Sequence, residues 1–331
     1  MVFFKIFPLR KLRFAVLIAA ALVICACGMI VTLGSRPADM PDTDTLPDNI
    51  PEAGSENIGN GHSSGAQADS EEESSDVSKS TAPVRLCVIM YHGLVKNRAR
   101  QNQYMIDPHF FEDDLRYLTE NGYTTIVTKD LTEHFLYGKP LPEKSVMLTF
   151  DDGYYNNYLY AFPLLKKYGC RAVLSPIGRA CEKAENEERQ DEFYSQCTIA
   201  QLGEMCESGV FELAYHTYDL HSISSGVQGV QQRPDENDAD YRTRLAQDIK
   251  SFSECMSQAC GDELCCFTYP FGAKSRLTDE IVRSSGFRCA LDCEEKVNIL
   301  DSPEELYSIH RFLRDGKTSS AEFFHKLEVM S

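Results

Sequence analysis

Apolar and polar residues divide the chain into three segments. Phe14 to Leu33 is apolar and carries no charged residue, and the short segment before it is basic. Residues 35–83 are rich in Ser, Pro, Gly, Asp and Glu and have almost no aliphatic clusters. Residues 84–331 alternate β-prone apolar runs with apolar residues at helical spacing. We therefore predict a membrane segment at 1–34, a linker at 35–83 and a folded domain at 84–331.

The N-terminal apolar segment is long enough to cross a membrane, because a helix rises about 1.5 Å per residue and the hydrocarbon core is roughly 30 Å thick. Basic residues precede it, so we expect a single-pass signal-anchor with the rest of the chain outside the cytoplasm. Two alternatives are a secreted protein with a cleaved signal peptide and a lipoprotein processed at Cys27. The apolar run continues past Cys27 to Leu33, which favours the uncleaved anchor.

Charge and cysteine content limit the function classes. The linker contains an acidic run, Asp69 to Asp76, and cannot bury enough apolar surface to fold, so we expect a disordered tether. The net charge is −17 and no stripe of Lys and Arg follows the N-terminus, which argues against nucleic-acid binding. The 13 cysteines have no regular framework spacing and no zinc-knuckle pattern. We expect many of them to be free thiols.

The folded segment predicts an α/β domain. Repeated strand and helix patterns imply a parallel sheet with right-handed crossovers, although periodicity alone does not say whether the sheet closes into a barrel. The predicted strands are 84–91, 124–127, 145–152, 172–175, 211–215 and 265–269, and the predicted helices are 108–121, 156–168, 198–209, 241–259 and 278–285.

Reactive residue types follow several of these strands directly. Asp151 and Asp152 end the buried run that begins at Ser145, and adjacent side chains on a strand point to opposite faces, so the two carboxylates can take different roles. His216 and His221 follow another strand, five residues apart. The carboxyl ends of parallel strands gather at one edge. Two imidazoles and one carboxylate suit a catalytic divalent metal with open positions for water.

Three motifs carry a family resemblance. Thr149–Gly153 (TFDDG), His216–His221 (HTYDLH) and Tyr269–Gly272 (YPFG) resemble, in order, motifs of the polysaccharide deacetylase family, also called the NodB-homology or carbohydrate esterase family 4 proteins. The resemblance covers residues 84–331. It implies a distorted (β/α) barrel and metal-dependent removal of acetyl groups, usually from N-acetylated sugars.

The same resemblance implies roles for individual residues. Asp152, His216 and His221 correspond to the metal ligands, and Asp151 corresponds to the general base. The backbone N–H of Tyr154 corresponds to an oxyanion donor. The implied cofactor is one divalent metal ion, Zn²⁺ in the first place, with Co²⁺, Ni²⁺ and Mn²⁺ as alternatives.

Two histidines are candidates for the general acid that protonates the leaving amine. His92 lies in a Met-Tyr-His sequence that resembles the poly-N-acetylglucosamine deacetylase branch of the family, where this histidine is the proposed acid. His310 superficially resembles the late Leu-x-His motif of other members. We favour His92. Tyr269 and Phe271 are either platforms for a sugar ring or plain core residues.

One departure from the family pattern concerns the base. Thr268 stands where the third motif usually begins with an arginine that contacts the base carboxylate. Asp151 must therefore be oriented by another group, and the missing arginine leaves its pKa open.

The sequence thus predicts a membrane-anchored N-deacetylase of a bacterial cell envelope, with its catalytic domain outside the cytoplasm and an N-acetylglucosamine-type polysaccharide as substrate. A non-catalytic carbohydrate-binding protein on the same fold and an O-acetyl esterase are the alternatives. We also expect the polar segment 222–240 to border the site.

Overall fold

The computed structural model describes residues 83–261 and 264–330. The predicted membrane segment and linker lie outside these residues. In the part of the chain that is described, no helix is long and apolar enough to cross a membrane.

A mostly parallel sheet forms the centre of the domain, as the alternating pattern predicted. The longest strand pair in the sheet is that of β1 and β5, which run parallel with Ile89 opposite Leu148. Every residue of β5 is buried, which explains its nearly continuous apolar sequence. The strands of this sheet are β12 (Asn298–Leu300), β1 (Val84–Tyr91), β5 (Ser145–Asp152), β6 (Ala172–Pro176) and β7 (Phe211–Leu213), with β13 (Phe312–Leu313) beside β1 and β4 (Thr124–Ile126) beside β5.

A second pair of strands connects the two edges of this sheet. β10 (Cys266–Thr268) runs parallel to β11 (Cys289–Leu291). Single bridges join Tyr215 to Phe267 and Leu291 to Ile309, so pairing passes from β7 through β10 and β11 to the segment that ends in β13. Since β13 pairs with β1, the strand contacts form a closed circuit. Such a circuit with irregular joints is what a distorted barrel requires.

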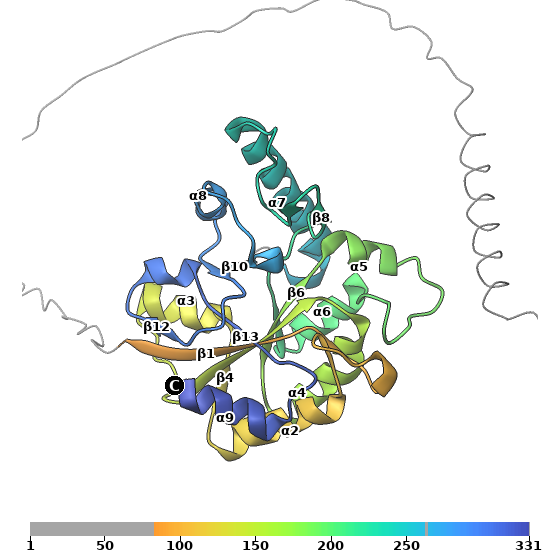
Figure 1. The fold of residues 1–331 in the computed structure, drawn as a ribbon, viewed down its shortest axis with the longest axis vertical. Coiled ribbons are helices and arrows are strands. Elements are labelled where there is room, and N and C mark those ends of the chain that lie inside the picture. Colours follow the sequence, from red (N-terminus) through yellow and green to blue (C-terminus); the bar gives the residue numbers. More distant parts are fainter. Residues whose placement is uncertain (1–82, 262–263, 331) are drawn as a thin grey trace, which may run out of the picture. The chain divides into compact units, whose positions relative to one another are not determined.

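Helices pack around the strands (Figure 1), with α2, α4 and α9 on one side of β1 and α7 and α8 on the other. Asp107 begins α2 by accepting a hydrogen bond from the His109 amide, and Thr198 caps α6 by accepting one from the Gln201 amide, at the starts of the helices predicted over 108–121 and 198–209. The sequence patterns did not indicate α3, α5 or α9. The helices are α2 (Pro108–Glu120), α3 (Thr128–Tyr137), α4 (Phe162–Tyr168), α5 (Gly178–Ala184), α6 (Ile199–Glu207), α7 (Asp238–Cys260), α8 (Thr278–Ser284) and α9 (Ser320–Met330).

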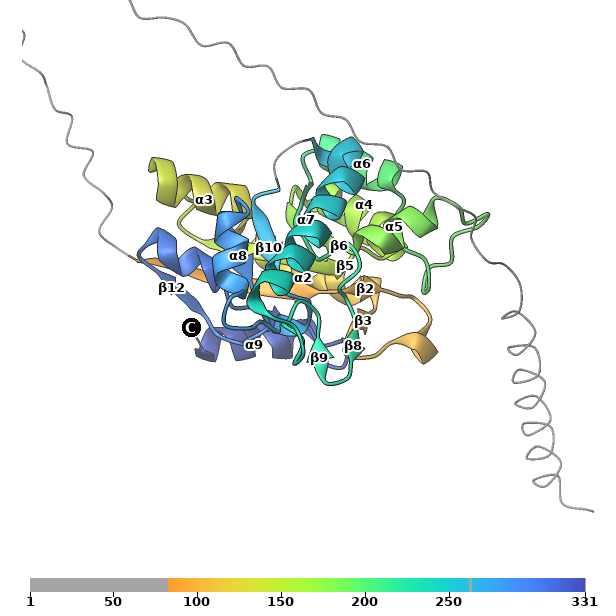
Figure 2. The same ribbon diagram turned by 90° about the horizontal axis from the view of Figure 1, so that it is seen from above.

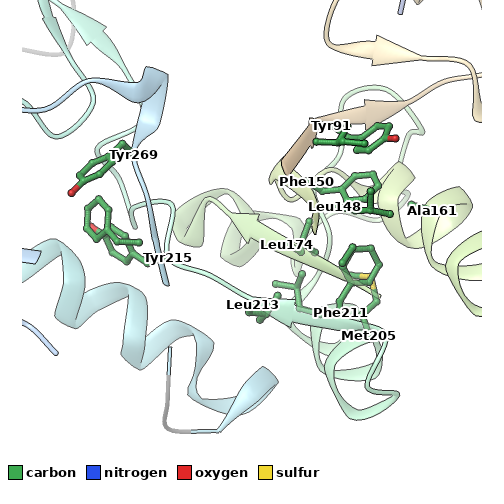
Figure 3. Close-up of a cluster of buried hydrophobic side chains, with 14 of the residues drawn as sticks. Tyr91, Leu148, Phe150, Ala161, Leu174, Met205, Phe211, Leu213, Tyr215 and Tyr269 are labelled. Carbon is green, nitrogen blue, oxygen red and sulfur yellow. The ribbon is translucent and has the colours of Figure 1, made fainter. Parts of the chain in front are cut away.

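Buried aromatic and aliphatic side chains fill the space between strands and helices. Figure 3 shows Tyr91, Phe150, Leu174 and Leu213 in this order across adjacent strands. The Phe150 ring lies 5.0 Å from that of Tyr91 and 5.7 Å from that of Phe211, measured between centroids. Fully burying such a side chain contributes about 1.5–3 kcal/mol. This core holds the end of β5 rigidly, and the two carboxylates stand at that end.

Two short strand pairs lie outside the main sheet. β2 (Gly93–Leu94) follows β1 after one residue, His92, and pairs with β3 (Met105–Ile106). β8 (Ile223–Ser224) and β9 (Val227–Gln228) form a hairpin beyond the N-terminal end of α7 (Figure 2). The polar segment 222–240 therefore contains a hairpin and the beginning of α7.

Candidate metal and catalytic site

The chain turns sharply at the end of β5. Asp152 and Gly153 both have positive φ values, 71° and 72°. A side chain at position 153 would be strained, and its Cβ would lie 2.6 Å from Cβ of Pro176. This glycine lets the backbone turn tightly against β6, so that Asp151 and Asp152 diverge as their alternation predicted.

Asp152, His216 and His221 come together at this turn. Oδ1 of Asp152 lies 3.6 Å from Nε2 of His216 and 3.4 Å from Nε2 of His221. In the described residues these three form the one group of His, Cys, Asp and Glu side chains close enough to share a metal ion. The set has two nitrogen donors and one oxygen donor, a combination that suits a divalent transition metal.

The surroundings of the three ligands fit a metal. Oδ1 of Asp152 is buried and has no hydrogen-bond partner among the described residues, so it points at the two imidazoles without a proton donor. Nδ1 of His216 lies 2.9 Å from the Thr268 carbonyl oxygen. A proton on Nδ1 leaves the Nε2 lone pair directed at Asp152, the arrangement that metal-binding histidines usually show. Burial raises the pKa of Asp152, but His216, His92 and His221 outweigh burial and lower it overall.

Asp151 is held by an arginine that sequence reasoning did not identify. Arg311 donates from Nη1 to Oδ1 of Asp151 at 2.7 Å and from Nη2 to Oδ2 at 2.9 Å. Its Nε donates to the Asp292 carbonyl at 2.7 Å, which fixes the plane of the guanidinium. Another group was expected to orient Asp151 in place of the usual arginine. That group is itself an arginine, and it comes from the segment before β13 rather than from position 268.

Arg311 also resolves the open pKa of the base carboxylate. Burial raises the pKa of Asp151, but the charge of Arg311 and its hydrogen bonds, together with His216 and His92, lower it overall. The carboxylate is therefore ionised at neutral pH.

His92 lies next to the same carboxylates. It follows β1 directly, and both Asp151 and Asp152 act on its charge. Burial lowers the pKa of His92, and the two carboxylates only partly offset this effect. Nδ1 is buried without a hydrogen-bond partner among the described residues, and the ring packs against that of Tyr104 at a centroid distance of 4.8 Å.

His310 has a different environment. Its Nδ1 lies 3.0 Å from Oδ1 of Asp292, and its amide donates to Asn298. Adjacent residues on an extended chain point to opposite faces. Because Arg311 points toward Asp151, His310 points away from it. This placement favours His92 over His310 as the acid.

The remaining candidates separate into two groups. Tyr269 is fully buried and donates its hydroxyl to Asp279, so the sugar-platform interpretation is wrong for this residue and the core alternative holds. Phe271 is 40% exposed and its ring lies 4.6 Å from that of His221, beside the metal ligands. Hydrogen bonds from Tyr155 to Ser195 and from Cys197 to Gly153 fix the backbone around Tyr154, whose oxyanion role stays a prediction.

The polar segment lies close to the metal ligands. Its residues Ser222, Gly229 and Arg233 line a cleft of about 280 Å³ together with Asp219 and Leu220, which directly precede His221. This arrangement supports the expectation that the segment borders the site.

The cysteines of the described residues agree with the expectation that many of the thiols are free. All those in the described residues are free, and burial raises the pKa of Cys87, Cys197 and Cys206 to about 12.

Comparison with known proteins agrees with the motifs. Residues 138–290, which include Asp151, Asp152, His216 and His221, match the polysaccharide deacetylase family. Over these residues the chain is similar to the polysaccharide deacetylase family. The match excludes β1 and the segment before β13, so two parts of the site, His92 and Arg311, lie outside it.

Relatives extend the similarity beyond that region. The chain is 26% identical over 260 residues to YxkH of Bacillus subtilis strain 168, which is named as a polysaccharide deacetylase, and the match covers 78% of this chain and 82% of YxkH. It is 27% identical over 257 residues to poly-β-1,6-N-acetyl-D-glucosamine N-deacetylase of Escherichia coli K12. That match covers 72% of this chain but only 38% of the E. coli enzyme.

Solved structures show the same fold. A de-N-acetylase from Aggregatibacter actinomycetemcomitans superimposes with a TM-score of 0.63 at 25% identity, covering 73% of this chain and 99% of that one. IcaB from Ammonifex degensii gives a TM-score of 0.57 at 29% identity, with 69% and 91% covered. The described domain therefore has the α/β fold, with a mostly parallel sheet, of these NodB-type deacetylases.

Proposed function

We propose that this deacetylase is a metal-dependent N-deacetylase that removes acetyl groups from N-acetylglucosamine-type polysaccharides of the cell envelope. The observation that carries the proposal is the pair of carboxylates at the end of β5. Asp152 faces two imidazoles, whereas Asp151 is held and ionised by Arg311. One carboxylate is thus placed for metal binding and the other for proton transfer.

Asp152, His216 and His221 would hold the cation. A divalent ion such as Zn²⁺, with Co²⁺, Ni²⁺ or Mn²⁺ as alternatives, supplies Lewis acidity toward the acetamide carbonyl and makes a nearby water more acidic. The hydrogen bond from His216 to Thr268 keeps Nε2 free for this role.

Asp151 acts as the general base. Its carboxylate takes a proton from the attacking water while Arg311 keeps both oxygens in a fixed plane. The Tyr154 amide, at the turn after Gly153, donates to the developing oxyanion.

His92 acts as the general acid. When the C–N bond breaks, the sugar nitrogen needs a proton, and the imidazole beside the two carboxylates supplies it. Asp151 and Asp152 favour the protonated form of His92 that this step needs, while burial lowers the pKa of the ring overall. Acetate and the free amine are the products.

The substrate class rests on the relatives. The E. coli protein and a Staphylococcus aureus protein, which is 25% identical over 216 residues, are both named poly-β-1,6-N-acetyl-D-glucosamine N-deacetylases. The Met-Tyr-His sequence before β2 points to the same branch. A location in the cell membrane, with the catalytic domain outside, rests on the N-terminal sequence alone.

Acetate release tests the proposal. The full-length chain, supplied with Zn²⁺, is incubated with oligomers of β-1,6-N-acetylglucosamine, chitin and peptidoglycan fragments, and with acetylated xylan. We expect acetate from at least one N-acetylated glycan, most rapidly from the β-1,6-linked oligomer, and none from the Asp151→Asn variant. Release from acetylated xylan alone would indicate an O-acetyl esterase, and glycan binding without release from any substrate would indicate a binding protein.

A further inference from the structure

Asn156 is a buried residue close in the chain to the base, and it contacts the loop that carries the acid. It follows the Asp151–Asp152 turn and directly precedes the π-helical turn η2 (Asn157–Ala161). Its side chain is fully buried. A buried amide must find hydrogen-bond partners, so the partners of Asn156 show what the residue connects.

The side-chain amide of Asn156 joins two loops. Its Oδ1 accepts a hydrogen bond from the Leu94 amide at 2.8 Å, and its Nδ2 donates to the Glu192 carbonyl at 2.8 Å. One partner is a donor and the other an acceptor, which fixes the orientation of the amide. Leu94 is two residues from His92, and Glu192 belongs to the loop whose Ser195 binds the Tyr155 amide.

Asn156 accepts a hydrogen bond on the side of β2 that has no neighbouring strand among the described residues. The amides of Gly93 and Val95 donate to Tyr104 and Ile106 on the β3 side, whereas the Leu94 amide faces the opposite way. Asn156 supplies the acceptor there. The fit is close, because a Cβ on Gly93 would lie 3.1 Å from Nδ2 of Asn156 and 2.4 Å from Sδ of Met105.

His92 depends on this loop for its position. Its buried Nδ1 has no hydrogen-bond partner among the described residues. The ring of His92 is therefore located by the backbone on either side and by packing against Tyr104, whose carbonyl in turn binds the Gly93 amide.

We propose that Asn156 is a positioning residue that fixes the His92 loop relative to the Asp151–Asp152 turn and so sets the reach of His92 to the leaving nitrogen. This inference rests on the proposed function and adds a residue to it. Asn156 touches neither substrate nor metal ligand in this role; it acts through the Leu94 amide. A displacement of the acid by about 1 Å can reduce turnover about 100-fold.

The leaving group separates positioning of the acid from general damage to the site. A sugar amine must be protonated as it leaves, whereas p-nitrophenolate leaves without an acid. Both reactions need the base and the metal. Loss of acid positioning should therefore slow the amide reaction selectively.

The test compares two substrates with the zinc-loaded full-length chain, the β-1,6-N-acetylglucosamine oligomer and p-nitrophenyl acetate. Asn156→Leu keeps the branched shape and the number of side-chain heavy atoms but removes the acceptor, and we expect kcat on the oligomer to fall about 100-fold at unchanged KM while kcat on the aryl ester stays close to wild type. Asn156→Asp keeps the acceptor for Leu94 but places an oxygen against the Glu192 carbonyl in place of the donor, so we expect it to recover only part of the loss. The matched control is Asn157→Leu, since Asn157 is equally buried but its amide has no partner among the described residues.

Equal loss on both substrates in Asn156→Leu, or the same selective loss in Asn157→Leu, overturns the proposal. If Asn156→Leu does not fold, Asn156→Ala takes its place in the same comparison: a loss confined to the oligomer supports the proposal, and an equal loss on both substrates overturns it. A wild-type protein that cleaves the aryl ester but no sugar acetamide contradicts the proposed function instead.

Discussion

Arg311 holds both carboxylate oxygens of Asp151, at 2.7 Å and 2.9 Å, and neither side chain is more than a few per cent exposed. The two parallel hydrogen bonds match the fork of a guanidinium to the plane of a carboxylate. A lysine could keep the charge but not this geometry.

Arg311→Lys should therefore impair catalysis more than it impairs folding. We expect kcat for acetate release to fall about 100-fold, because the base carboxylate loses its fixed orientation. The control is Arg314→Lys, which affects a second buried arginine that binds both oxygens of Asp114 away from the metal ligands. Equal losses of kcat in the two variants, measured on the folded fraction, would show that Arg311 has no special role in the reaction.

The turn at Gly153 should not accept a side chain. Gly153→Ala places a Cβ against Pro176 in addition to the cost of a positive φ, so we expect loss of metal binding and of stability beyond about 1 kcal/mol. Gly209→Ala is the matched control, because Gly209 has the same φ of 72° and no atom within 4 Å of an added Cβ. Urea unfolding compares the two variants, and similar stabilities would contradict the steric explanation.

Phe271 is a strained residue beside the metal ligands. Its φ of 60° costs an ordinary residue about 1–2 kcal/mol, and such strain persists where function requires it. Phe271→Gly should raise the melting temperature and also raise KM for the glycan, since the exposed ring is lost. Phe271→Ala should raise KM without the gain in stability. A KM unchanged in both variants would remove Phe271 from the substrate-binding surface.

The ion pair between Glu236 and Arg244 should make the stability of the polar segment depend on pH. Nε of Arg244 lies 2.7 Å from Oε1 of Glu236, and the hydrogen bonds from Arg244 lower the pKa of Glu236. A folded-state pKa below the unfolded value of about 4.3 stabilises the fold above that pH, and the stabilisation is lost as pH falls through the folded-state pKa. Glu236→Gln should lower the melting temperature by about 2–4 °C at pH 7, with the difference shrinking toward pH 3. A difference that stays constant with pH would show that the ion pair does not cause it.

Local sequence features predicted much of the fold. β1 begins and ends where its apolar run does, and α2 begins at Pro108, as predicted. β11, β12 and β13 were missed because each has only two or three residues and exists through pairing with distant strands. The same applies to closure of the sheet, which depends on the single bridges at Tyr215 and Ile309.

The residues of the candidate site show the same contrast between local sequence motifs and contacts that depend on distant segments. Asp151, Asp152, His216 and His221 were recognisable because they lie within short contiguous motifs. Arg311 was not, because its contact with Asp151 spans 160 positions and requires the strand circuit to bring β13 beside β1. The one available signal was that a charged residue, Arg311, directly precedes the apolar pair Phe312 and Leu313.

The most direct measurement of the central claim is metal content together with acetate release from the β-1,6-N-acetylglucosamine oligomer. We predict that chelation removes one metal ion per chain and abolishes release, that Zn²⁺ restores both, and that Asp152→Asn neither retains the ion nor releases acetate. Acetate release that continues at the wild-type rate after the metal has been removed would contradict the account.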